Sequence, residues 1–200
     1  MNNGKICISI CVETAEDLIA QIKCAEDLAD VIEIRFDCLE TNQIHKSFAL
    51  LSSETPLLFT YRPKKQGGKI ELNLHQRLAF WNAFVANGLF DKRKFLVDFE
   101  FDLKSEISNF KFQKIISFHD FSGVINNLET IYKNLSETAE TIKIAVQTND
   151  INDAIPIWKL LERAKSENRQ IIPIAMGESG KWTRILGLAH GAFIDRKSVV

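Results

Sequence analysis

Apolar runs of strand length alternate with amphipathic stretches along the whole chain. The predicted strands are Lys5–Cys11, Val31–Phe36, Pro56–Tyr61, Lys94–Phe99, Lys114–Phe118, Thr141–Val146, Ile171–Met176 and Gly191–Asp195. A repeated strand–helix unit is typical of parallel strands joined by helical crossovers. The pattern therefore predicts an α/β protein whose strands form either an open doubly wound sheet or a closed barrel.

Helices are expected between these strands. The predicted helices are Ala15–Ala29, Asn73–Ala86, Val124–Leu135, Asp153–Lys165 and Lys181–Ala189. Thr14, followed three residues later by Asp17, resembles a capping box at the start of the first helix. In the second helix, helical spacing predicts an apolar stripe of Leu74, Leu78, Trp81 and Val85.

Alternation within the strands favours the barrel. In the second strand Ile32, Ile34 and Phe36 share one face, and Glu33 and Arg35 lie on the other. Strands of an open α/β sheet are covered on both faces and read as continuously apolar, whereas here one face is polar. The pattern predicts a single-domain (β/α)8 TIM-type barrel over residues 1–200, with helices outside and a small polar interior.

The polar faces also predict where the chemistry lies. Charges turned into a closed interior are costly unless they are paired. We therefore expect one network, at the C-terminal strand ends where βα barrels carry their active sites. Its expected members are Glu33, Arg35, Asp37, Arg62, Asp98, Glu100 and Lys143.

Bulk properties exclude several classes of protein. The formal net charge of −1 over 200 residues gives no electrostatic footprint for nucleic acid or an anionic membrane. No apolar run approaches the length of a membrane span, and the N-terminus lacks a signal-peptide pattern. The expected location is the cytoplasm.

The cysteines carry no metal-site or redox motif. Cys7, Cys11, Cys24 and Cys38 form no Cys-x-x-Cys pair, and the four histidines are scattered. No zinc-like spacing is present, so no metal site is predicted. The cysteines are interpreted as reduced core residues.

Lys143 and His119 are the candidate reactive groups. Lys143 lies in the middle of an apolar strand, where burial disfavours the ammonium form and leaves a nucleophilic amine that can form a Schiff base. His119 ends the preceding strand and could exchange protons with the same substrate. The alternatives are a lysine whose head reaches solvent and a hydrogen-bonded core histidine.

Arg184 is the candidate anion ligand. It follows Met-Gly-Glu-Ser-Gly-Lys-Trp-Thr (176–183), where the seventh strand turns into a helix. An arginine near a helix N-terminus suits a carboxylate, although a solvated helix residue is equally compatible with this segment. The Gly- and Lys-rich segment 62–69 is expected to be a loop over the barrel mouth.

Six segments along the chain contain the candidate residues and their neighbours. They are Glu-Ile-Arg-Phe-Asp (33–37), Phe-Thr-Tyr-Arg-Pro-Lys (59–64), Val-Asp-Phe-Glu (97–100), Ile-Ser-Phe-His-Asp-Phe (116–121), Lys-Ile-Ala-Val-Gln (143–147) and Ala-Met-Gly-Glu-Ser-Gly-Lys-Trp-Thr-Arg (175–184). In this order they resemble type I 3-dehydroquinate dehydratase. Each segment alone is loose, but the ordered set is specific and covers nearly the whole chain.

The resemblance implies a barrel enzyme of the shikimate pathway of aromatic amino acid biosynthesis. It would convert 3-dehydroquinate to 3-dehydroshikimate and water without metal or cofactor. Lys143 would form the Schiff base and His119 would act as general acid and base, while Arg184 would bind the substrate carboxylate. The implied substrate-binding residues are Ser9, Glu33, Ile34, Arg35, Arg62 and Arg184.

The chain departs from the family pattern in two places. Gln66 stands where the family usually has Glu, so it cannot supply a negative charge. The sequence given ends at Val200, without the family's lid loop and last helix, as in a fragment, one part of a bifunctional enzyme or a natural short form. Uncovered apolar surface there would favour a homodimer.

Two alternative functions stay open at this point. A Schiff-base aldolase would use the same lysine but cleave a carbon–carbon bond. A catalytically silent barrel would bind a ligand without turnover. Gln66 and the absent lid are the sequence features that favour this alternative.

Overall fold

The computed structural model describes residues 4–86, 95–107, 110, 112–123 and 127–198. The chain divides into two units, which we describe separately. The N-terminal unit comprises residues 6–113 with 197–200, and the C-terminal unit comprises residues 114–196 with 1–5.

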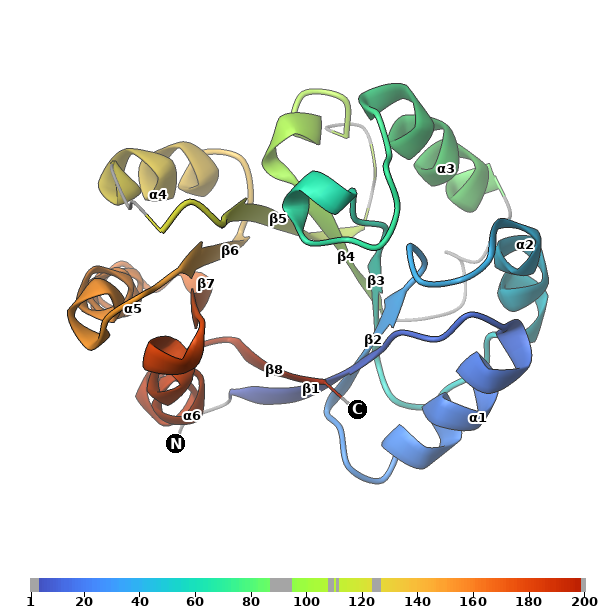
Figure 1. Ribbon diagram of the computed structural model, residues 1–200, viewed down its shortest axis with the longest axis horizontal. Coiled ribbons are helices and arrows are strands. Elements are labelled where there is room, and N and C mark those ends of the chain that lie inside the picture. The colour runs from blue at the N-terminus through green and yellow to red at the C-terminus, as the bar shows by residue number, and fades with distance from the viewer. Residues whose placement is uncertain (1–3, 87–94, 108–109, 111, 124–126, 199–200) are drawn as a thin grey trace. The chain divides into compact units, whose positions relative to one another are not determined.

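The N-terminal unit contains four strands in chain order, with helices between them (Figure 1). Its elements are β1 Lys5–Ile10, α1 Ala15–Ala25, β2 Val31–Arg35, α2 Thr41–Leu50, β3 Leu57–Thr60, α3 Leu74–Ala86 and β4 Phe95–Glu100. Each strand pairs in parallel with the next. Short 3-10 helices follow β3 at Lys64–Gln66 and β4 at Phe101–Leu103.

The C-terminal unit repeats the strand–helix alternation. Its elements are β5 Gln113–Asp120, α4 Leu128–Ser136, β6 Thr141–Gln147, α5 Ala154–Ser166, β7 Gln170–Met176, α6 Lys181–His190 and β8 Ile194–Ser198. Strand β6 pairs in parallel with β5 on one side and with β7 on the other. Short 3-10 helices at Ile151–Asp153 and Glu178–Gly180 follow β6 and β7.

An aromatic core joins the helices of the N-terminal unit to one face of its strands. Phe59 of β3 packs against Phe84 of α3 with ring centroids 5.0 Å apart, and Phe99 of β4 packs edge-on against Trp81 at 4.9 Å. Such edge-to-face pairs add to the stabilisation from apolar burial. Because strand side chains alternate, this packing turns the intervening residues toward the face away from the helices.

The first helix begins where the sequence predicts. The backbone N–H of Asp17 donates to the Thr14 hydroxyl oxygen at 3.1 Å, which confirms Thr14 as the N-cap. The helix ends at Ala25 rather than Ala29. Helix α2 was not predicted, because only Ser47 and Phe48 of its residues are buried and no apolar period marks it.

The predicted apolar stripe of α3 is wrong in part, since Trp81 is buried as predicted but two other members are not. Leu74 and Val85 are 42% and 37% exposed, and the buried residues are Arg77, Trp81 and Phe84. These three also recur at helical spacing, so the face of the helix that packs against the core contains a charged residue. The reason is that carboxylates at the end of β4 bind Arg77.

The interpretation of the cysteines is also wrong in part. Cys11 and Cys38 form a disulfide, with their Cα atoms 5.2 Å apart. Cys7 lies outside the disulfide and is buried, as expected for a reduced core residue, but Cys24 is exposed. Parallel pairing of β1 with β2 brings together the residues that follow the two strand ends, although the spacing of 27 residues carries no local signal.

Reduction of this disulfide is expected to lower the free energy of unfolding by about 3 to 4 kcal/mol, since the bridge closes a loop of 27 residues. Denaturant titration with and without a thiol reductant measures the difference. The Cys11→Ser/Cys38→Ser variant should show no effect of the reductant. Four free thiols in the unfolded, unreduced protein would contradict the bridge.

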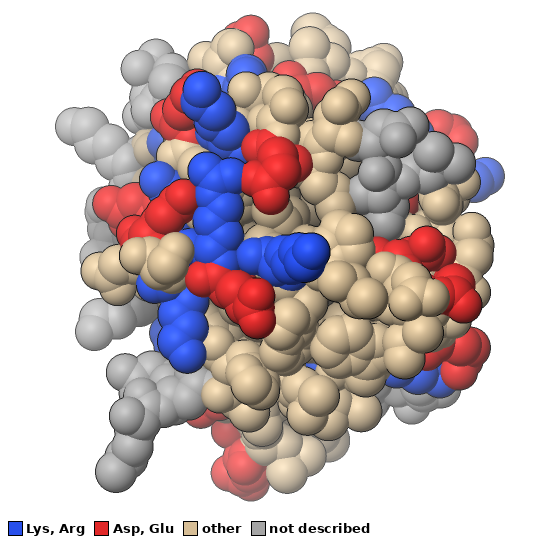
Figure 2. Space-filling model, turned by 90° about the vertical axis from the view of Figure 1, so that its left-hand side faces the viewer, with Lys and Arg blue, Asp and Glu red and all other residues tan. Residues whose placement is uncertain are grey.

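The outer surface of the C-terminal unit carries charges of both signs. On α5, Arg163 forms ion pairs with Glu129 of α4 and with Glu167, the latter at 2.8 Å. Figure 2, which faces the α4, α5 and α6 side, shows basic and acidic side chains next to one another. Exposed pairs of this kind contribute little to stability.

Within the described residues, no helix combines the length and apolar character that a membrane crossing requires.

Candidate active site

Strands β1 to β4 place a buried polar cluster on the face away from the helices. Parallel register sets Ser9 beside Glu33, then Arg35 beside Thr60, and Thr60 beside Asp98. The same alternation brings Arg62 and Glu100 to the strand ends. All members of this cluster, including Asp37, are under 10% exposed. The predicted interior position of these side chains agrees with their burial.

Arg35 is fixed by a two-bond contact with Asp37. Its Nε and Nη2 donate to the two carboxylate oxygens at 2.8 and 2.6 Å. Asp37 also accepts the backbone N–H groups of Arg62 at 3.3 Å and Lys69 at 3.0 Å. Burial acts to lower the pKa of Arg35, but the contact with Asp37, together with the charges of Glu33 and Asp98, raises the pKa above the ordinary value. Arg35 is therefore a permanent cation with a set orientation.

Arg62 is held between two carboxylates. Its Nη2 donates to Asp98 Oδ2 at 2.5 Å, and its Nε lies 3.6 Å from Glu100 Oε1. Burial again acts to lower the pKa of Arg62, and the charges of Asp98 and Glu100 raise it. Together with the Arg35–Asp37 pair, these contacts join five of the predicted network members. Glu33 accepts the hydroxyl of Thr60 at 2.8 Å.

Glu100 has the most perturbed acidity of this cluster. Burial raises its pKa to about 7, with a further rise from Asp98, while Arg62 and Arg77 act to lower it. A carboxyl with this pKa changes its charge near neutral pH. Its ionic contacts with the two arginines therefore depend on pH.

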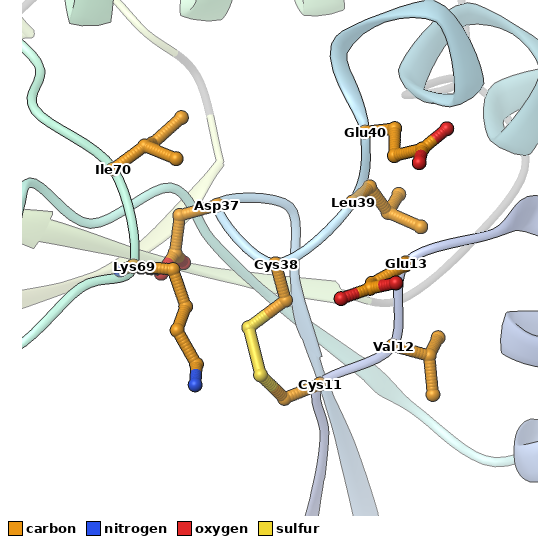
Figure 3. Close-up of a pocket in the computed structure, with 9 residues that line it drawn as sticks. All are labelled: Cys11, Val12, Glu13, Asp37, Cys38, Leu39, Glu40, Lys69 and Ile70. Carbon is orange, nitrogen blue, oxygen red and sulfur yellow. Dashed lines mark hydrogen bonds between the residues drawn. A yellow bond between two sulfur atoms is a disulfide. The ribbon is translucent and has the colours of Figure 1, made fainter.

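A pocket of about 400 Å³ opens beside Asp37. It is lined by Cys11, Val12, Glu13, Asp37, Cys38, Leu39, Glu40, Lys69 and Ile70 (Figure 3). The Cys11–Cys38 bridge forms one wall and ties the end of β1 to the residue after Asp37. The covalent link thereby restrains the carboxylate that orients Arg35.

In the C-terminal unit, Lys143 and His119 lie on one face of neighbouring strands. Lys143 pairs with Ser117 of β5 and with Ile172 of β7, and His119 pairs with Ala145. This register offsets the two side chains by one strand and two residues, or about 8 Å between Cα atoms. Lys143 is 3% exposed and His119 is 9% exposed. One small substrate can therefore reach both side chains.

Arg184 lies on α6 and is half-buried. The preceding glycines serve chain packing: Gly177 has φ +91°, and a Cβ on Gly180 would lie 2.3 Å from the Ala175 oxygen. The turn is closed by Thr183, whose hydroxyl donates to the Gly180 oxygen at 2.7 Å. This turn positions the start of α6, and with it Arg184, at the C-terminal end of β7.

Two residues modify the predicted site. Ile34 is fully buried and alternates with Glu33 and Arg35, so its side chain lies on the helix-facing side of β2. Arg77 was not predicted, because nothing in its helix distinguishes it from a surface arginine.

Gln66 ends the 3-10 helix after β3 and is half-exposed. No cluster of His, Cys, Asp or Glu side chains suited to a metal occurs among the residues that the structure describes.

Known proteins match this chain along nearly its whole length. A family model described as type I 3-dehydroquinase matches residues 6–198. The 3-dehydroquinate dehydratase of Methanococcus vannielii is 28% identical over 203 residues, which cover 97% of this chain and 89% of the relative. The 3-dehydroquinate dehydratase of Methanocaldococcus jannaschii is 30% identical over 200 residues, covering 92% of this chain and 86% of the relative.

Solved structures agree on the fold. The crystal structure of type I 3-dehydroquinate dehydratase from Clostridium difficile matches with a TM-score of 0.86 at 24% identity, covering 99% of this chain and 85% of that one. The predicted (β/α)8 fold class is thereby confirmed.

Proposed function

Because the chain belongs to the type I 3-dehydroquinase family, a family of hydro-lyases, we propose that it converts 3-dehydroquinate to 3-dehydroshikimate and water. The observation that carries this proposal is the buried lysine on the polar face of β6, with a histidine on the same face of β5. A desolvated lysine and a proton-transfer group are the two elements that imine-based dehydration requires.

Lys143 opens the reaction as the nucleophile. Its amine attacks the substrate ketone carbon, and loss of water from the carbinolamine gives an iminium ion. Attack requires the neutral amine, and apolar surroundings such as Ile172 favour that form in general. The positive nitrogen then withdraws electrons and makes the neighbouring C–H bond acidic.

His119 moves the protons of the later steps. It removes the proton from that carbon, which leaves an enamine. It then returns a proton to the β-hydroxyl, so that the carbon–oxygen bond breaks and water departs. The conjugated iminium that remains is hydrolysed by a second water, which releases the enone product and restores Lys143.

The arginines and their neighbours bind the substrate in this proposal. Arg184 takes the carboxylate, and Arg35 and Arg62 contact substrate hydroxyls from guanidinium groups that carboxylates already orient. Ser9 and Glu33 supply further hydrogen bonds. Ile34 acts through its backbone, because its side chain faces the helices. A single domain, a homodimer and a cytoplasmic location stay predictions.

Incubation of the purified chain with 3-dehydroquinate tests the function. The expected result is a rise in ultraviolet absorbance from the conjugated product, with a product mass that is lower by one water. Two smaller fragments would indicate the aldolase. Saturable binding of 3-dehydroquinate without any change in its mass would support the silent barrel and overturn the proposal.

A further inference from the structure

Arg77 is a buried cation that the proposed chemistry does not use. It belongs to α3, on the helix side of the strands, yet its exposed fraction is 0%. Its Nη1 donates to Asp102 Oδ1 at 2.8 Å and its Nη2 donates to Asp102 Oδ2 at 2.6 Å. Nη1 also donates to Glu100 Oε2 at 3.1 Å. The guanidinium therefore connects a half-exposed carboxylate to a fully buried one.

Glu100 connects Arg77 to Arg62. One carboxylate oxygen accepts from Arg77, and the other lies 3.6 Å from Arg62 Nε. Arg62 in turn donates to Asp98. The result is a row of alternating charges, Asp102, Arg77, Glu100, Arg62 and Asp98, in which each inner member has an opposite charge on both sides. We call these five side chains the ion-pair row.

Removal of Arg77 would change the charge of Glu100. The groups that act on Glu100 are Arg62 at the end of β3, Asp98 on β4 and Arg77 on α3. Burial raises the pKa of Glu100 to about 7, and Arg77 is one of the two cations that oppose this rise. Without Arg77 the pKa would lie higher still, so Glu100 would be protonated at neutral pH. A neutral Glu100 no longer attracts the Arg62 guanidinium as an ion.

We propose that Arg77 is a positioning residue for substrate binding: it holds Glu100 as an oriented carboxylate, and Glu100 in turn fixes the Arg62 guanidinium. The inference rests on the proposed function, in which Arg62 contacts the substrate. A purely structural Arg77 would fill space and neutralise Asp102 without influence on substrate affinity.

Steady-state kinetics of four variants test the inference. At pH 7, Arg77→Met is expected to raise KM about 10-fold to 100-fold, the value of a charge-assisted contact, with a smaller effect on kcat. The KM of Arg77→Met should fall as pH rises from 7 to 9, because Glu100 then loses its proton and attracts Arg62 again. Arg77→Lys should recover part of the affinity. Arg77→Met/Glu100→Gln should bind no worse than Glu100→Gln alone.

The matched control is Arg163→Met, which removes an arginine from exposed ion pairs on α5. Its KM should equal that of the unmodified protein at every pH. An unchanged KM in Arg77→Met, or a rise that does not depend on pH, would overturn the inference. So would a double variant that binds far worse than Glu100→Gln.

A titration without turnover separates this inference from the proposed function. Carbon-13 NMR of glutamate carboxyls, assigned with Glu100→Gln, should show Glu100 titrating near pH 7 and at higher pH in Arg77→Met. If Arg77→Met does not fold, Arg77→Lys should show a smaller shift in the same direction. An unshifted Glu100 refutes the inference whatever the activity, whereas a shifted Glu100 in an inactive chain refutes the proposed function alone.

Discussion

Replacement of Lys143 by alanine is expected to lower kcat for 3-dehydroquinate by about 10⁴-fold or more, the order of loss when a covalent nucleophile is removed. The substrate then lacks the Lys143 amine, with which it is proposed to form the imine that makes its C–H bond acidic. Affinity for 3-dehydroquinate should change little, because the arginines proposed to bind it remain. Stopped assays with large enzyme excess measure the residual rate.

Lys114→Ala is the matched control for this variant. Lys114 lies at the start of β5 in the same unit, one residue before the segment that pairs with β6. The kcat of Lys114→Ala should stay within about twofold of the unmodified protein, because Lys114 lies at the start of β5, away from the C-terminal strand end that carries His119. A Lys143→Ala variant with activity comparable to this control would exclude the lysine as nucleophile.

Replacement of His119 by alanine is expected to lower kcat by about 10²-fold to 10⁴-fold, the range for loss of a general acid and base. Proton removal and departure of water both slow, while Lys143 can still form the imine. The imine should therefore accumulate. Rapid quenching followed by intact-mass analysis would detect a larger covalent fraction than in the unmodified protein.

His75→Ala serves as the control, since His75 is exposed on α3. It should leave both kcat and the covalent fraction unchanged. A His119→Ala variant with full kcat, or one that forms no imine while it still turns over, would contradict the assigned role.

The strand pattern was informative because a strand has a period of two residues. Glu33 and Arg35 alternate with the apolar Ile32 and Ile34, so both charges can only lie on one face. The same rule placed Lys143 with Ser117 and, two residues on, His119. Local alternation therefore predicted both the fold class and the placement of the candidate reactive groups.

Features that depend on distant parts of the chain were not predictable from local patterns. Arg77 is buried only because Glu100 and Asp102, more than 20 residues away, accept its hydrogen bonds. The Cys11–Cys38 bridge depends on how β1 and β2 are paired. A period of apolar residues records neither a partner nor a register, so these contacts appear only in three dimensions.

Reductive trapping at Lys143 tests the central claim most directly. The chain is incubated with 3-dehydroquinate and borohydride, digested, and analysed by peptide mass spectrometry. A single stable adduct is predicted on the peptide that contains Lys143, absent without substrate and absent in Lys143→Ala. Turnover without any adduct, or an adduct that persists in Lys143→Ala, would contradict imine catalysis by this lysine.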